Sequence, residues 1–140
     1  MDTLCDQMML KGFLMKIPDW ITKYTNTLNE LHQTGCKVVE LGAGSGFLAA
    51  CIMANSNKPI NYLATDAMKG DDTFTKTYFK VQKLNHIEAL TKNPDADVLI
   101  INWPTYQNKW ASEALRKFEG DIVIYIGEGM GGCNADDVFF

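Results

Sequence analysis

The chain has 140 residues, of which 46% are hydrophobic and 21% are charged, and its net charge is −4. This length and balance predict one domain with a substantial hydrophobic core. The acidic excess and the lack of a basic cluster argue against a nucleic-acid interface. The four cysteines are scattered and only two histidines accompany them, so we expect no metal site and reduced thiols in a cytoplasmic protein. The apolar stretch at residues 8–17 is too short for a membrane span.

The first half of the chain alternates helical and strand patterns. Apolar residues from Trp20 to Leu31 recur at helical spacing after the potential cap Asp19, so residues 1–36 are predicted as an N-terminal helical segment. A strand is expected at 37–41, a helix at 47–54 and a second strand at 60–65.

The second half continues this alternation. The sequence predicts a helix at 74–84, a short third strand near 86–88 and a buried strand at 98–101. A helix at 110–118 and a last apolar strand at 122–126 follow. The chain is therefore expected to be one α/β domain, doubly wound and Rossmann-like, with a mostly parallel sheet of about five strands and helices on both faces. Its core would span residues 37–127, and residues 128–140 would form a glycine-rich, acidic tail.

The most informative motif is the run E-L-G-A-G-S-G at residues 40–46, between a predicted strand and a predicted helix. Glycine has no Cβ, so it accepts positive φ and lets a ligand approach the backbone. The next helix begins with unpaired N–H groups and a partial positive charge. Asp66 ends the second strand about 20 residues later, where a carboxylate can bind both hydroxyls of a ribose. The pattern predicts a nucleotide-like ligand at the carboxyl ends of the strands.

The glycine spacing separates two ligand classes. The dinucleotide fingerprint G-x-G-x-x-G would need a third glycine where this chain has Phe47. An acidic residue before three alternating glycines instead resembles motif I of the class I S-adenosylmethionine-dependent methyltransferases. The resemblance covers roughly residues 38–126 and implies S-adenosylmethionine as the cofactor. The positively charged sulfonium and ammonium groups of this cofactor also pair better with carboxylates than with a loop built to bind phosphate.

The resemblance implies a role for each matching residue. Glu40 would help to hold the ammonium end of the cofactor, and Asp66 would hold its ribose. Glu88 would lie near the adenine amino group, with a solvent-exposed carboxylate as the alternative. The full set of implied cofactor contacts is Glu40, Gly42, Ala43, Gly44, Gly46, Asp66, Ala67, Glu88, Ala89 and Asn102.

A second motif, N-W-P-T-Y at residues 102–106, follows the predicted strand at 98–101. It resembles motif IV of amino-methyltransferases, in which an Asn or Asp side chain and a proline carbonyl accept hydrogen bonds from the target amine. The implied catalytic residues are Asn102, which would orient the acceptor, Tyr106, which would stack on it, and Trp103, which would shape the pocket. Trp103 replaces the first proline of the motif and Tyr106 stands one residue late, so an ordinary strand end is the alternative.

The function implied by the resemblance is methyl transfer from S-adenosylmethionine to a small or planar nucleophile, such as an amine. This displacement requires alignment of the reactants and exclusion of water, but no strong base. Two alternatives stay open. One is a non-catalytic or degenerate subunit that binds S-adenosylmethionine, favoured by the short chain and the irregular second motif. The other is an NAD(P)-binding Rossmann protein, which Phe47 disfavours.

The last predicted strand raises the question of a partner. Members of the resembled family usually continue with a helix and a hairpin beside this strand, whereas this chain stops at Phe140. An apolar edge at 122–126 is a template for pairing with another chain. We therefore expect a homodimer or a partner subunit at this edge. The glycine-rich tail would be either a mobile lid over the site or an ordinary surface loop.

Overall fold

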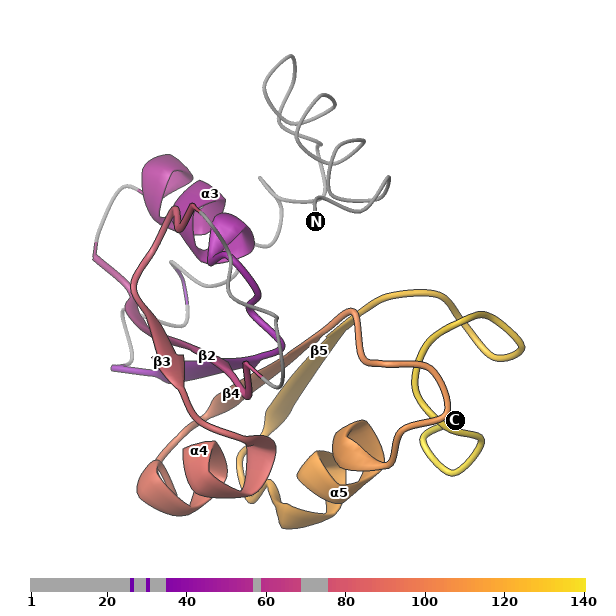
Figure 1. Cartoon of the computed structure of the whole chain (residues 1–140). Helices are drawn as coiled ribbons and strands as arrows, with labels where there is room; N and C mark the ends of the chain where they lie inside the picture. Colours follow the sequence, from indigo (N-terminus) through magenta and orange to yellow (C-terminus); the bar gives the residue numbers. More distant parts are fainter. Residues whose placement is uncertain (1–25, 27–29, 31–34, 57–58, 69–75) are drawn as a thin grey trace.

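The computed structural model describes residues 26, 30, 35–56, 59–68 and 76–140 (Figure 1). This part of the chain forms a sheet of five parallel strands in the order β3-β2-β1-β4-β5. The strands are β1 (Lys37–Leu41), β2 (Asn61–Asp66), β3 (Val81–Lys83), β4 (Val98–Asn102) and β5 (Ile122–Ile126). The helices are α3 (Phe47–Asn55), α4 (His86–Lys92) and α5 (Trp110–Lys117). The predicted doubly wound α/β fold is confirmed.

The sheet lies between two layers of helix, with α3 on one face and α4 and α5 on the other (Figure 1). Successive side chains of a strand point to opposite faces, so β1 contributes to both layers. Val38 packs in the cluster that contains Leu48 and Ile52 of α3, whereas Val39 packs in the cluster of α4 and α5. Because both faces are covered, residues 98–101 of β4 are an unbroken apolar run, as in most central parallel strands.

The register of the sheet aligns the carboxyl ends of its central strands. Leu41 of β1 stands opposite Thr65 of β2 and opposite Ile101 of β4. The residues that follow these positions, Asp66 and Asn102, therefore reach the same edge of the sheet as the glycine turn after β1. The fold itself brings together the two motifs that are far apart in the sequence.

Two predicted elements are wrong. The described part of the expected helix at 74–84 contains no helix, and its Val81–Lys83 pairs with β2 as β3. The reason is that Phe79 and Val81, two residues apart, pack on the same cluster beside Ala64, which requires extended backbone. The expected strand at 86–88 is the first turn of α4. Asn85 accepts a hydrogen bond from Glu88 N while Glu88 accepts one from Asn85 N, and this capping box starts a helix.

The N-terminal helix expected between Trp20 and Leu31 lies outside the described residues, apart from Asn26 and Glu30. Among the residues that are described, no helix has the length and apolar character needed to cross a membrane.

The C-terminal tail packs back onto the domain. Phe139 joins the core cluster of α4 and α5, and its ring centroid lies 4.9 Å from that of Tyr125 on β5. In Figure 1 the tail runs beside the start of α5. β5 is the last strand of the sheet described here, and Val123 on it is 42% exposed. The partner expected at this edge stays a prediction.

The turn before α3 yields a stability prediction. Gly46 has a φ of 76°, and a Cβ there would lie 2.9 Å from the backbone oxygen of Phe79. Gly131 has a φ of 84° with open space around it, so it serves as a matched control. We expect Gly46→Ala to lower the free energy of unfolding by roughly 2–4 kcal/mol and Gly131→Ala by roughly 1 kcal/mol. Urea denaturation measures both, and equal losses would contradict the close packing at Gly46.

Candidate functional site

The glycine turn of residues 42–46 joins β1 to α3 and adopts positive φ at all three of its glycines. Gly42 allows the closest approach, because a Cβ there would lie 2.6 Å from the backbone oxygen of Asn102. Ala43 N donates to Thr65 O of β2 at 3.0 Å, which ties the turn to the neighbouring strand. Gly46 precedes α3 in a left-handed conformation, and no side chain caps the helix. The first turn of α3 therefore carries a partial positive charge.

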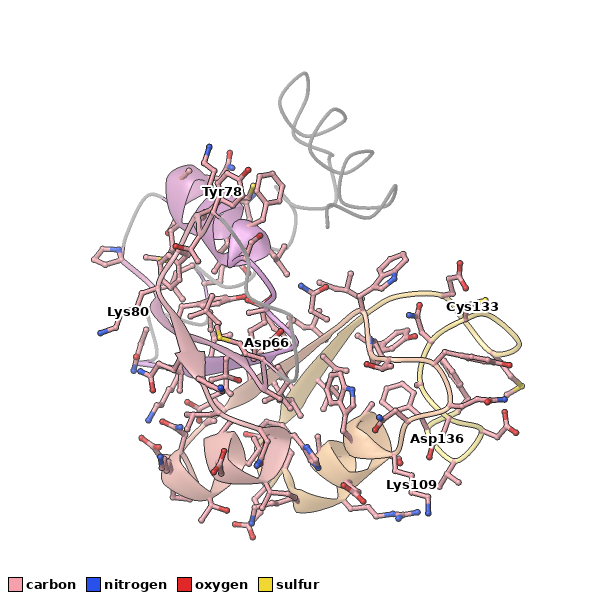
Figure 2. All side chains as sticks on the ribbon, in the orientation of Figure 1. Asp66, Tyr78, Lys80, Lys109, Cys133 and Asp136 are labelled. Atoms are coloured by element: carbon pink, nitrogen blue, oxygen red, sulfur yellow. The ribbon has the colours of Figure 1, made fainter. Side chains whose placement is uncertain are left out.

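Asp66 lies at the end of β2, against the glycine turn (Figure 2). Its Oδ2 accepts a hydrogen bond from Gly44 N and its Oδ1 accepts one from Met68 N, both at 2.9 Å. These two bonds fix the plane of the carboxylate. A carboxylate has about four lone-pair sites, so capacity for two further donors remains. Ala67, the next residue, is half-buried. Asp66 can thus hold a pair of hydroxyls next to the turn.

Glu40 is fully buried on β1, with 0% of its surface exposed. Its Oε2 accepts a hydrogen bond of 2.6 Å from the Tyr62 hydroxyl, and its Oε1 accepts one of 2.8 Å from Asn102 Nδ2. Burial raises the pKa of Glu40 from 4.5 to about 7, although both hydrogen bonds act to lower it. Neither ion pair of the described residues includes Glu40. Among the described residues, its charge is therefore held by neutral donors alone.

The loop after β4 carries the predicted catalytic residues. Asn102 is half-buried beside Glu40, whereas the side chains of Trp103 and Tyr106 are 48% and 55% exposed. Trp103 has a φ of 47°, and its N donates to Ile126 O at 2.7 Å. The loop thus presents two aromatic rings to solvent next to a fixed amide.

The tail donates two hydrogen bonds to the proline carbonyl of this loop. Pro104 O accepts a hydrogen bond of 3.0 Å from Asn134 Nδ2 and one of 3.2 Å from Ala135 N. Asn134 is itself buried, and Gln107 N donates to Ala135 O at 2.8 Å. A carbonyl oxygen has two lone pairs, and both are used here. In this conformation Pro104 O has no free lone pair for an amine.

Glu88 and Ala89 lie on α4. Glu88 is exposed and its carboxylate takes part in the capping box, while Ala89 is fully buried in the core. No hydrogen bond of the described residues links either of them to the glycine turn. Their predicted contact with an adenine ring stays a prediction. The other predicted site residues lie at or next to the turn: Glu40, Gly42, Ala43, Gly44, Gly46, Asp66, Ala67 and Asn102.

Three residues of the site were missed from the sequence. Tyr62 contacts Glu40, the ring of Trp110 lies 3.5 Å from the Cβ position of Gly42, and Asn134 contacts Pro104. Tyr62 had a usable signal, because a tyrosine that packs within a strand needs a partner for its hydroxyl. Trp110 and Asn134 are brought to the site by α5 and by the tail, whose positions no local pattern encodes.

Comparison with known protein families, with curated proteins and with solved structures gives no match to this chain. Within the described ranges, no three His, Cys, Asp or Glu side chains come close enough to hold a metal ion. A surface hollow lies at the far ends of α4 and α5, lined in part by Leu90, Pro94 and Phe118. No residue of the glycine turn lines this hollow, and neither Asp66 nor Asn102 does.

The burial of Glu40 predicts a pH-dependent stability. Folded Glu40 binds its proton up to about pH 7, whereas the unfolded residue releases it near 4.5. The folded state is therefore favoured below pH 4.5, and this contribution, on the order of 2–3 kcal/mol, is lost as the pH rises through about 7.

We expect Glu40→Gln to remove this component, because glutamine does not ionise. The free energy of unfolding, measured by urea denaturation at about pH 5 and about pH 8.5, should then fall less for the variant than for the wild type. The exposed Glu119 provides the matched control, and Glu119→Gln should keep the wild-type slope. The same slope in all three proteins would contradict the raised pKa.

Proposed function

We propose that the chain binds S-adenosylmethionine at the glycine turn and transfers its methyl group to a small or planar nucleophile. The observation that carries the proposal is the hydrogen bond between Gly44 N and Asp66 Oδ2, at 2.9 Å. It supports a ligand that lies over the turn with its sugar at the carboxylate. The resemblance of residues 40–46 to motif I supplies the cofactor class.

The charges around the turn favour a cationic ligand. Glu40 and Asp66 are both carboxyl groups at this edge of the sheet, and Asp66 acts to raise the pKa of Glu40 by charge repulsion. A ligand that brings an ammonium and a sulfonium group would reduce this repulsion, whereas a pyrophosphate would increase it. Electrostatics thus support S-adenosylmethionine over NAD(P).

The geometry of the turn also disfavours the NAD(P) alternative. Phe47, at the position of the third fingerprint glycine, begins α3 and its ring packs edge-on against Tyr78, with centroids 5.1 Å apart. A dinucleotide site needs glycine there for close packing of helix and strand. Here the close packing occurs one residue earlier, between Gly46 and Phe79.

A second candidate function is binding of S-adenosylmethionine without catalysis. It is favoured by the state of Pro104, whose carbonyl accepts hydrogen bonds from Asn134 and Ala135. In the resembled amino-methyltransferases, this carbonyl would accept from the target amine. An enzyme of this chain would therefore position its acceptor through Asn102 and the exposed rings of Trp103 and Tyr106.

Cofactor binding is tested by Asp66→Ala. We expect affinity for S-adenosylmethionine and S-adenosylhomocysteine to fall at least about tenfold, because a charged hydrogen-bonding partner contributes about 1.5–3 kcal/mol. Asp137, exposed in the tail, gives the control Asp137→Ala, which should bind as the wild type does. Titration calorimetry with these two compounds and with NAD measures the affinities, and urea denaturation checks the fold. Binding of NAD alone, or unchanged affinity in Asp66→Ala, would refute the site.

Catalysis is tested separately by transfer of a tritiated methyl group from S-adenosylmethionine into a cell extract. We expect labelling by the wild type and a loss of at least about tenfold in Asn102→Ala, since an acceptor that is no longer oriented reacts more slowly. Asn61→Ala, exposed at the start of β2, is the control. Cofactor binding without any labelled acceptor would leave the non-catalytic function as the conclusion.

A further inference from the structure

Three side chains on adjacent strands form a hydrogen-bonded group around a buried carboxyl, called here the Glu40 cluster: Tyr62 on β2, Glu40 on β1 and Asn102 on β4. The strand registers place all three on the face of the sheet that α3 covers. Glu40 stands between the other two and accepts one hydrogen bond from each, at 2.6 Å from Tyr62 and 2.8 Å from Asn102. Its own 0% exposure keeps it from touching a ligand directly.

The chemistry of the cluster fixes the orientation of the Asn102 amide. An ionised carboxylate only accepts hydrogen bonds, so the NH₂ group of Asn102 must face Glu40 Oε1. The carbonyl oxygen Oδ1 is then turned away from Glu40. No described residue donates a hydrogen bond to Oδ1, and Asn102 is only half-buried at the end of β4. Among the described residues, the amide is thus held through its nitrogen alone, which leaves Oδ1 as an acceptor beside the glycine turn.

The cluster also favours one class of donor at that atom. The negative charge of Glu40 lies directly behind the amide and has no cation within the ion pairs of the described residues. A hydrogen bond from Asn102 Nδ2 to a carboxylate polarises the amide and makes Oδ1 a stronger acceptor. A positively charged N–H donor therefore gains the most there.

We propose that Glu40 is a positioning residue, which with Tyr62 holds the Asn102 amide so that Oδ1 accepts a hydrogen bond from the ammonium group of the bound ligand. The identity of that ligand rests on the proposed function. The orientation of the amide does not, because it concerns only groups of this chain. Glu40 thus acts on the ligand through Asn102 and in its ionised form.

Protonation of Glu40 weakens this arrangement, since a neutral carboxyl can donate its own proton to Asn102 Oδ1 or to Tyr62. Burial raises the pKa of Glu40 to about 7. The other titratable groups of the surrounding elements are Asp66 on β2, whose charge opposes ionisation of Glu40, and Cys51 on α3, whose pKa is raised by burial. Burial and the charge of Glu40 hold the pKa of Tyr62 well above its usual 10, so its hydroxyl stays a donor.

The experiment is a pH titration of the ¹⁵N-labelled full chain by NMR, between about pH 5 and about pH 9. The Asn102 side-chain amide is assigned by its loss in Asn102→Ala. We expect its signals to shift with a midpoint near 7, because they report the ionisation of Glu40. Asn93, whose Nδ2 donates to Ala89 O, is the control amide within the same protein and should not follow this midpoint.

Two variants show whether Glu40 and Tyr62 cause the shift. Glu40→Gln should abolish the midpoint near 7. Tyr62→Phe should move it to higher pH, because the Tyr62 hydrogen bond lowers the pKa of Glu40. An Asn102 amide that does not titrate in the wild type, or that titrates unchanged in Glu40→Gln, would overturn the proposal. Neither measurement requires a ligand.

The role toward the ligand is tested with S-adenosylhomocysteine and with 5′-methylthioadenosine, which lacks the amino-acid end with its ammonium and carboxylate groups. From about pH 5.5 to about pH 8, wild-type affinity for the first should rise at least about fivefold and affinity for the second should stay constant. Glu40→Gln should show no rise for either compound. An equal rise for both would overturn the ammonium contact. If neither compound binds, the proposed function fails and the ammonium contact fails with it, while the amide titration still decides whether Glu40 orients Asn102.

Discussion

The close backbone approach at the turn between β1 and α3 is the constraint on which the rest of the site depends. Gly42 passes the backbone oxygen of Asn102 at a distance that excludes a Cβ, and Gly46 does the same against Phe79. These two contacts bring the turn close to the end of β4 and to the segment that leads into β3. They also leave Gly44 N directed at Asp66 and the start of α3 without a side-chain cap. The lack of side chains at these glycines therefore has two effects. It allows the turn to pack tightly, and it lets a ligand approach the backbone.

The site combines fixed and exposed parts. Glu40, Asp66 and Asn102 are held by hydrogen bonds to neighbouring strands or to the turn, so their positions are set once the sheet forms. Trp103 and Tyr106 are exposed and free to pack on a ligand. The tail bridges these parts through Asn134, which contacts both Pro104 O and Glu128 N. Asp136 of this tail, labelled in Figure 2, accepts a hydrogen bond of 3.2 Å at Oδ2 from the Ser112 hydroxyl of α5.

Much of the fold follows from local patterns. The strands at 37–41, 98–101 and 122–126 and the helix at 110–118 were predicted close to their observed bounds. Each strand is centred on a short apolar run, and the helix is a regular amphipathic repeat. The helix predicted at 74–84 was wrong. The spacing of Phe74, Tyr78 and Val81 in the sequence is helical, but Phe79 and Val81 pack as an extended pair. The strand predicted at 86–88 was wrong because the capping box at Asn85 starts a helix there.

The sequence by itself determined the alternation of strands and helices, the glycine turn and the placement of Asp66 after a strand. These features depend on residue type and spacing, which can be read directly from one sequence. Only the tertiary structure decided that Glu40 is enclosed between Tyr62 and Asn102, and that the tail covers Pro104 O. Such contacts join residues from 22 to 62 positions apart, and they depend on the order and register of the strands, which local preferences do not specify.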